Sequence, residues 1–139
     1  MFKIVVGENR LIGVAFSHHG KREPHPDNPS YLSKFARGFK TIDVRHSQCR
    51  LVELFLDSEG NVLSEELLGE GETRCDPRDN FRRSKGRRVA LDCAMQFVKR
   101  DKKLDALERE TFWNEIFKLD PDLKKETGVN GSEPLPPPA

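Results

Sequence analysis

Apolar and polar residues alternate along much of the first half of the chain, which is the pattern of antiparallel strands with one buried face. Ile12, Val14 and Phe16, for example, recur at every second position. Turn-forming residues at 7–9 and 57–60 separate the alternating segments. The pattern predicts an antiparallel meander of about five strands, over residues 2–6, 10–18, 39–46, 48–56 and 61–74.

The segment between the second and third predicted strands has a different composition. Residues 20–30 hold three prolines and no apolar side chain, so we expect an exposed loop there. Residues 31–37 follow with a short helical pattern that Gly38 would close. The sheet is thus expected to be interrupted by one polar loop and one short helix.

Helical spacing replaces strand alternation in the second half of the chain. Val89, Ala90, Cys93, Ala94 and Phe97 recur at intervals of one helical turn. This spacing predicts a helix over about residues 85–100 with a face of small residues that packs on the sheet.

A second helix is predicted to follow, because Asp105 and Glu108 form a capping pair ahead of an apolar series. The pair Asp120-Pro121 would start a further short turn of helix. The expected fold class is therefore α+β, with an antiparallel sheet of about five strands followed by two helices packed on it. The apolar residues of the second helix are Leu107, Phe112, Trp113, Ile116 and Phe117.

Length and composition indicate one domain with a moderate core. A chain of 139 residues with 35% hydrophobic and 34% charged residues is too short for two comfortable domains and is rather polar. Nine phenylalanines, with Trp113 and Tyr31, supply aromatic mass for the core. We expect a single domain over residues 1–126 and a disordered, proline-rich tail over residues 127–139.

The net charge of +1 conceals a segregation of charge along the sequence. Residues 51–73 contain seven acids and no Lys or Arg, whereas residues 74–103 contain eleven Lys or Arg against four Asp, a local charge of +7. Such poles can guide an acidic ligand to one face, or can pair with a second copy of the chain. Both uses stay open, and the second would make a homo-oligomer.

Cysteine usage and hydropathy indicate a cytoplasmic protein. The three cysteines lack CxxC spacing, so neither a disulfide scaffold nor a zinc ribbon is indicated. The apolar run near Met1 is too short for a signal peptide, and no stretch approaches the roughly 18 apolar residues of a membrane span. We expect neither export nor a membrane partner.

The segment 75–94, CDPRDNFRRSKGRRVALDCA, joins a turn, a basic cluster and a helix start. Asp79 or Ser84 can cap the helix, and Gly86 lets the backbone approach a ligand closely. The N–H groups of a helix start add partial positive charge, which favours phosphate or another oxyanion as the ligand. The basic side chains of this segment are Arg82, Arg83, Lys85, Arg87 and Arg88, preceded by Arg78.

Catalytic groups are not evident. No GxSxG pattern occurs, and Cys49 and Cys93 fall where a strand or helix would bury them. Cys75 is the one cysteine with a basic neighbourhood that could favour a reactive thiolate. We therefore expect no enzymatic activity.

The four histidines lie in the first third of the chain without the spacing that builds a metal site from one element, and HEXXH is absent. His18, His25 and Asp27 could converge across the loop, but a solvated loop is the preferred interpretation. We expect no metal and no cofactor.

Nucleic-acid binding is an alternative interpretation of the basic segment. Its arginines could contact a backbone while Phe81 stacks on a base. The neutral total charge argues against a track for a long polyanion. Arg74 and Arg78 could instead neutralise the acidic strands, and Phe81 could be a hydrophobic staple into the core; these alternatives stay open.

The same segment resembles a pattern in small phage and prophage proteins, in which Cys-x-Pro-x-Asp-x-Phe precedes Gly-Arg and an Ala-rich helix. Among such proteins the layout is similar to anti-Thoeris sponge proteins, which sequester cyclic ADP-ribose-type signals without hydrolysing them. The resemblance implies an oligomeric binder with the ligand between the sheet-to-helix junction and the second helix. Phe81 would supply the aromatic and Arg109 the arginine around the adenine. The residues that carry the pattern are Cys75, Pro77, Asp79, Phe81, Gly86, Arg87 and Ala90.

We therefore expect a non-catalytic protein that sequesters a small phosphorylated ligand, either a cyclic nucleotide or a cyclic ADP-ribose-type immune signal. A nucleic-acid-binding or protein-interaction factor of phage origin is the alternative. The expected ligand-binding residues are Asp79, Asn80, Phe81, Arg82, Arg83, Lys85, Gly86, Arg87 and Arg109.

Overall fold

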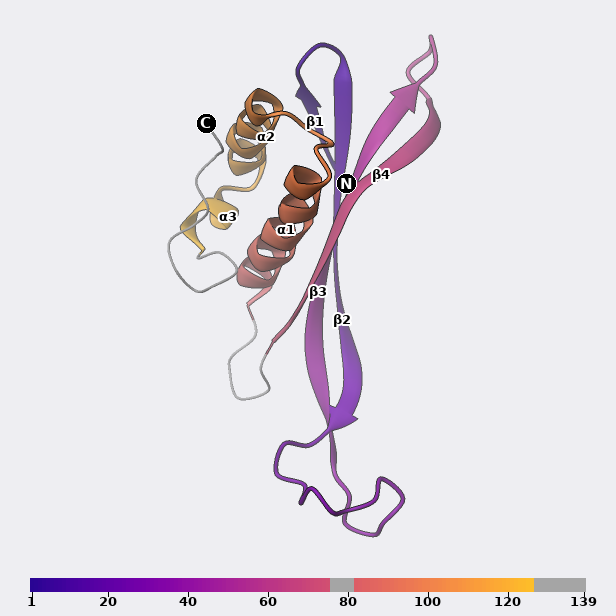
Figure 1. Ribbon diagram of the computed structural model, residues 1–139, viewed down its shortest axis with the longest axis vertical. Helices are drawn as coiled ribbons and strands as arrows, with labels where there is room; N and C mark the ends of the chain where they lie inside the picture. The colour runs from indigo at the N-terminus through magenta and orange to yellow at the C-terminus, as the bar shows by residue number, and fades with distance from the viewer. Residues whose placement is uncertain (76–81, 127–139) are drawn as a thin grey trace.

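A four-stranded antiparallel sheet carries the helices on one of its faces in a computed structural model, which describes residues 1–75 and 82–126 (Figure 1). The strands lie in chain order, so each strand pairs with its sequence neighbours. The predicted α+β class, with an antiparallel sheet before the helices, is confirmed. The elements are β1 (Phe2–Val6), β2 (Arg10–Pro24), β3 (Thr41–Leu56), β4 (Val62–Arg74), α1 (Arg83–Arg100), α2 (Ala106–Leu119) and α3 (Pro121–Lys125).

The sheet has four strands because the two strands predicted over 39–46 and 48–56 are one continuous strand, β3. β2 is also longer than predicted and pairs with β3 from Leu11↔Leu54 to Pro24↔Thr41. The expectation of a loop over 20–30 is therefore wrong for residues 20–24. Backbone ladder bonds do not require apolar side chains, so a polar segment pairs when its partner strand runs beside it.

The hairpin of β2 and β3 extends well beyond the helices, and its connection forms the far tip of the molecule (Figure 1). Residues 31–37 form turns here, and the predicted short helix is wrong. Tyr31 and Phe35 are each 87% exposed. A short helix needs an apolar face packed on a neighbour to be stable, and these side chains have no core to enter.

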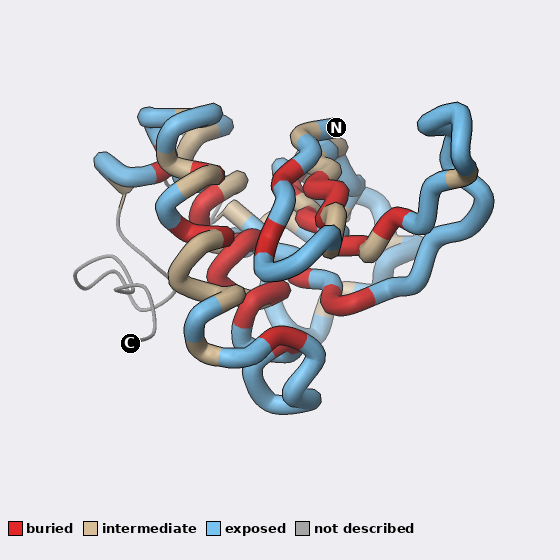
Figure 2. Tube along the Cα trace, turned by 90° about the horizontal axis from the view of Figure 1, so that it is seen from above, coloured by how far each residue is buried: buried red, intermediate tan, exposed pale blue. Residues whose placement is uncertain are grey.

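The core lies between the helices and one face of the sheet (Figure 2). Val14, Cys49 and Leu51 enter it from the sheet, and Leu91 and Trp113 enter it from α1 and α2. Gly69 and Gly71 of β4 face α1, because a Cβ built on either would meet the α1 backbone at Ala90 or Ala94. Glu70 and Glu72, which alternate with these glycines, consequently face away from the helices.

Helix boundaries follow the capping signals in part. Asp105 and Glu108 form the predicted capping box of α2, with Asp105 accepting from the Glu108 N–H at 2.7 Å. α3 starts at Pro121 as predicted. Ser84 does not cap α1, however, because the helix begins at Arg83 and the Ser84 hydroxyl donates to Glu126 at 2.8 Å. The other cap candidate, Asp79, lies outside the described residues.

A fully buried ion pair joins two turns of α1 within the core. Arg88 and Asp92 are both 0% exposed, and the Arg88 Nε donates to the Asp92 carboxylate at 3.2 Å. The guanidinium also donates to the Leu123 carbonyl at 2.9 Å and lies 5.0 Å from the centre of the Trp113 ring. Arg88, which the sequence grouped with the basic cluster, is therefore a core residue that fastens α3 and α2 to α1.

Two further expectations concern the C-terminal tail and membrane-spanning helices. The predicted tail over 127–139 lies outside the described residues. Among residues 1–75 and 82–126, no helix combines the length and apolarity needed to cross a membrane.

Candidate functional site

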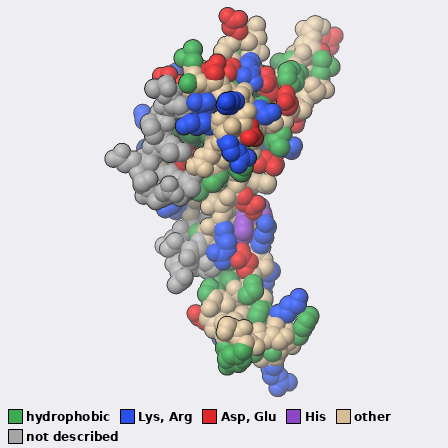
Figure 3. Space-filling model, in the orientation of Figure 1, with side chains coloured by type: hydrophobic (Ala, Val, Ile, Leu, Met, Phe, Trp, Pro, Cys, Tyr) green, Lys and Arg blue, Asp and Glu red, His purple; other side chains and the backbone are tan. Residues whose placement is uncertain are grey.

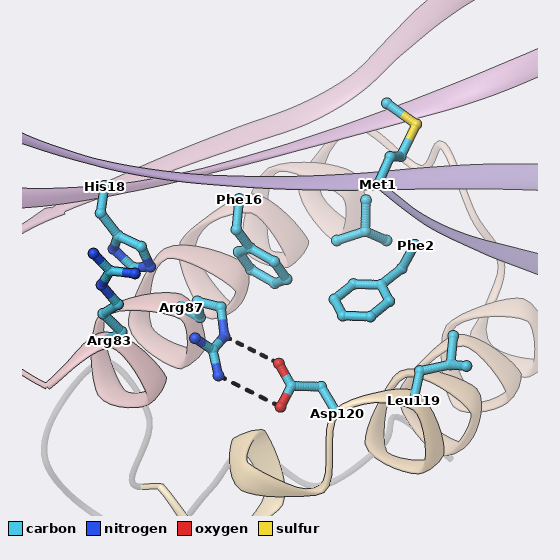
Figure 4. Close-up of a pocket in the computed structure, with 9 residues that line it drawn as sticks. Met1, Phe2, Phe16, His18, Arg83, Arg87, Leu119 and Asp120 are labelled. Atoms are coloured by element: carbon cyan, nitrogen blue, oxygen red, sulfur yellow. Dashed lines mark hydrogen bonds and ion pairs between the residues drawn. The ribbon is translucent and has the colours of Figure 1, made fainter.

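A pocket of about 490 Å³ opens between the sheet, the first turns of α1 and the junction of α2 with α3 (Figure 4). This volume is in the range of small-molecule sites, which are about 300–1,000 Å³. The lining residues are Met1, Phe2, Val14, Phe16, His18, Arg83, Arg87, Leu119 and Asp120.

The apolar side of the pocket comes from the first two strands. Strand alternation directs Val14, Phe16 and His18 of β2 toward the helical side of the sheet. Phe2 of β1 meets Phe16 edge to face, with ring centres 6.2 Å apart. Both rings are only partly buried and pack against the edge of the core, so they present aromatic surface to a bound molecule.

The basic side of the pocket is the start of α1. Arg83 is the first residue of the helix, and its side chain lies beside the His18 ring (Figure 4). Arg83 forms no ion pair with any residue of the ranges 1–75 and 82–126. The first turn of α1 contains no acidic residue and has no side-chain cap. Positive charge at this rim is thus available to an anion.

His18 lies between the apolar and basic sides. Its Nδ1 is 2.8 Å from the Ser47 hydroxyl, across the β2–β3 ladder. Partial burial lowers the pKa of His18 below its usual value, and the neighbouring Arg83 and Arg87 charges lower it further. The imidazole is consequently neutral at pH 7 and becomes a second positive group only in acid.

Arg87 forms part of the wall and is held by an ion pair. Its Nε donates to one oxygen of Asp120 at 3.0 Å, and a second nitrogen reaches the other oxygen at 3.5 Å (Figure 4). Asp120 is fixed in turn, because it is the single residue between Leu119, where α2 ends, and Pro121, where α3 begins. The Arg87–Asp120 ion pair therefore holds the α2–α3 junction against α1, and both residues form part of the pocket wall.

The structure brings together two of the predicted ligand residues, Arg83 and Arg87. Arg82 instead bonds to Glu126 at 2.9 Å, and Lys85 is exposed and does not line the pocket. Gly86 is buried within α1. Asp79, Asn80 and Phe81 lie outside the described residues, so whether Phe81 faces a ligand or the core stays a prediction.

Arg109 does not line the pocket with Arg83 and Arg87. It lies in the first turns of α2, where a guanidinium nitrogen donates to the Leu104 carbonyl at 2.8 Å. The pocket meets the other end of α2, at Leu119 and Asp120. Sequence reasoning placed Arg109 by layout, and α2 runs in the direction that carries it away from the start of α1.

Sequence reasoning missed Phe2, Phe16, His18 and Asp120 as pocket residues. The alternation of Val14, Phe16 and His18 was a usable signal, since it places all three on one face of β2. No signal of similar strength marked Asp120, whose approach to Arg87 depends on how the helices pack.

Nucleophilic chemistry has little support in the pocket. None of its lining residues within the described ranges is Ser, Thr, Cys or Lys. Cys49 is buried as predicted, and burial raises the pKa of its thiol; burial also raises the pKa of the half-buried Cys93.

Comparison of the chain with models of protein families, with curated proteins and with solved structures finds no match.

Proposed function

We propose that this protein is a non-catalytic binder that sequesters a small phosphorylated ligand in the pocket between the sheet and the start of α1. One observation carries the proposal: aromatic surface from Phe2 and Phe16 and the side chain of Arg83 line the same pocket. A nucleotide presents a flat apolar base and an anionic phosphate, which these two sides complement. The helix start reinforces the preference for the anion.

The ion pairs of the basic segment favour a small ligand over a long polyanion. Arg82, Arg87 and Arg88 are already engaged by Glu126, Asp120 and Asp92. These carboxylates neutralise three of the arginines at short range, and among residues 1–75 and 82–126 Arg83 is the pocket arginine that is not engaged by an ion pair. A long nucleic acid instead needs positive charge spread along a whole face.

Within this class we propose a cyclic nucleotide or a cyclic ADP-ribose-type signal. Support comes from the resemblance of residues 75–94 to a pattern in small phage and prophage proteins, among which the layout of this chain is similar to anti-Thoeris sponge proteins. A pocket between the sheet-to-helix junction and α2 is also where that resemblance implies the ligand. The same resemblance implies an oligomer and a phage anti-defence role, which belong to the proposal.

Calorimetry of the full chain tests the ligand class directly. Cyclic ADP-ribose isomers and cyclic oligonucleotides would be titrated beside short RNA and DNA at the same salt concentration. We expect saturable binding of at least one small cyclic ligand and its recovery intact after denaturation. Binding of the polymers alone would refute the proposal, and recovery of degraded ligand would show an enzyme.

We expect Arg83→Gln to weaken binding of the small ligand about 10- to 100-fold. A hydrogen bond to a charged group is worth about 1.5–3 kcal/mol, and each 1.4 kcal/mol is about a factor of ten. The matched control is Lys85→Gln, which removes the same charge from the first turns of α1 at a residue outside the pocket. Calorimetry with the two variants should separate a contact from a general charge effect. Equal losses in both would show that Arg83 makes no specific contact.

Binding should strengthen as the pH falls from about 7.5 to about 5. The pKa of His18 is lowered in the free protein, so the ring is neutral at the upper pH and gains a proton only in acid. A phosphodiester or pyrophosphate stays ionised across this range, so the added positive charge favours the complex. Dissociation constants at several pH values test this, with His18→Gln as the variant that should flatten the profile. A wild-type profile that matches the His18→Gln profile would exclude His18 from the site.

A further inference from the structure

A second cluster of polar side chains lies on the opposite face of the sheet. His19, His46 and Glu72 come from β2, β3 and β4, three adjacent strands. His19 is the register partner of His46, and Glu72 belongs to the set of β4 residues that face away from α1. Figure 3 shows a histidine side chain among acidic and basic side chains, between the helical layer and the hairpin tip.

We propose that His19, His46 and Glu72 bind a divalent first-row transition-metal ion such as Zn²⁺. Their three ligand atoms lie within 4.8 Å of one another. The Glu72 Oε1 is 3.2 Å from the His46 Nδ1 and 3.8 Å from the His19 Nε2. Tetrahedral bonds of about 2.0–2.1 Å place ligand atoms roughly 3.3 Å apart. The two rings lie nearly parallel, at 15° with centres 5.6 Å apart, so the partly exposed His19 ring has to turn for its Nε2 to reach an ion shared with His46 and Glu72.

The surroundings of His46 supply the strongest support. The ring is 10% exposed, with its Nε2 3.0 Å from the Glu23 carboxylate and its Nδ1 3.2 Å from the Glu72 carboxylate. Each ring nitrogen of His46 thus faces a carboxylate oxygen. This arrangement lets one carboxylate orient the ring while the opposite nitrogen and the second carboxylate share one metal ion.

Glu23 would act as the supporting carboxylate of such a site. If the His46 Nε2–H donates to Glu23, the Nδ1 lone pair is directed at the metal, as in carboxylate–histidine–metal triads. Glu23 is itself oriented by Arg74, whose Nε donates to it at 2.8 Å. Two imidazoles and one carboxylate suit Zn²⁺ and its neighbours in the first transition row.

Lys21 competes with a metal for the same oxygen. Its Nζ lies 3.2 Å from the Glu72 Oε1, so the ammonium neutralises Glu72 when no metal is bound. The Lys21 side chain is 52% exposed and flexible, which lets it move into solvent when a metal binds. Its removal should therefore raise metal affinity, whereas removal of a ligand should lower it.

Zinc titration of the full chain, without an affinity tag, tests the site by calorimetry. We expect one Zn²⁺ per chain, with affinity lowered by at least about 100-fold in His19→Ala and Glu72→Gln, and by about 10- to 100-fold in the supporting variant Glu23→Gln. Lys21→Gln should bind more tightly than the wild type. His25→Ala is the matched control, because His25 pairs with Asp27 in the loop beyond the cluster.

Two results would overturn the proposal. One is a wild-type chain that binds no Zn²⁺ in the calorimetric titration. The other is Zn²⁺ binding that His19→Ala leaves unchanged. His19 is about 38% exposed, so its variant should keep the fold, which circular dichroism verifies, even if His46→Ala does not.

Discussion

Asp92→Asn should lower the free energy of unfolding by about 3–5 kcal/mol. The substitution keeps the shape of the side chain and removes its charge, so the buried Arg88 guanidinium loses its carboxylate partner within α1. Water cannot compensate, because both side chains are 0% exposed. Urea unfolding of the wild type and the variant measures the difference.

Two companion variants make this test specific. Asp101→Asn breaks the exposed pair with Arg100, whose side chain is 68% exposed, and should cost less than about 1 kcal/mol. The double change Arg88→Met with Asp92→Leu removes both buried charges and should recover much of the lost stability, since well-packed apolar replacements of buried pairs are often neutral. A single Asp92→Asn variant as stable as the wild type would show that the pair is not electrostatically coupled.

Gly71→Ala should also destabilise the fold, by about 1–3 kcal/mol or more. A Cβ at this position would meet the Ala90 carbonyl oxygen, the Ala94 nitrogen at 2.6 Å and the Cys93 Cβ at 2.7 Å. The first two are backbone atoms, so α1 as a whole would have to move away from β4. Thermal or urea unfolding provides the measurement.

Gly20→Ala is the matched control for this prediction. Gly20 also lies within a strand, but the atoms nearest to a Cβ there are 3.9 and 4.0 Å away, which is ordinary contact. We expect no loss of stability from this change, since alanine also reduces the entropy of the unfolded chain. Similar losses in both variants would attribute the Gly71 effect to the loss of glycine and not to the close approach of α1.

The elements of the fold that carry a clear apolar period could be predicted from the sequence. Alternation located β1, and helical spacing with the Asp105 capping box located α1 and α2. The extension of β2 to Pro24 could not be found this way, because its polar residues 20–24 pair through backbone bonds and side-chain contacts such as Glu23 to His46. Periodicity reports burial, and this arm of the sheet lies beyond the helices.

The candidate pocket was predictable to a smaller extent. Arg83 and Arg87 could be identified from the basic segment at the start of α1, because a cluster of neighbouring residues is visible in the sequence itself. The carboxylates that bind Arg87 and Arg82 belong to Asp120 and Glu126, which lie more than thirty positions further along the chain. Their pairing depends on tertiary packing, which a linear motif does not encode.

The histidine cluster shows the same limit. His19 and His46 lie far apart in sequence, and Glu72 comes from a third strand. A search of the sequence for metal ligands spaced within a single helix or strand therefore does not find these three residues together. The cross-strand register of β2 and β3 is what brings the two rings into contact, 5.6 Å apart.

We propose that a small phosphorylated ligand binds between Phe2, Phe16 and Arg83, and nuclear magnetic resonance of the isotopically labelled full chain is the most direct test. Cyclic ADP-ribose, or the tightest small cyclic ligand found by calorimetry, would be added to saturation. The two phenylalanine rings and the Arg83 side-chain Nε should then show the largest shifts, while Arg109 and His25 stay unchanged. Shifts centred on Arg109, or no shift at any pocket residue with every ligand tested, would contradict the claim.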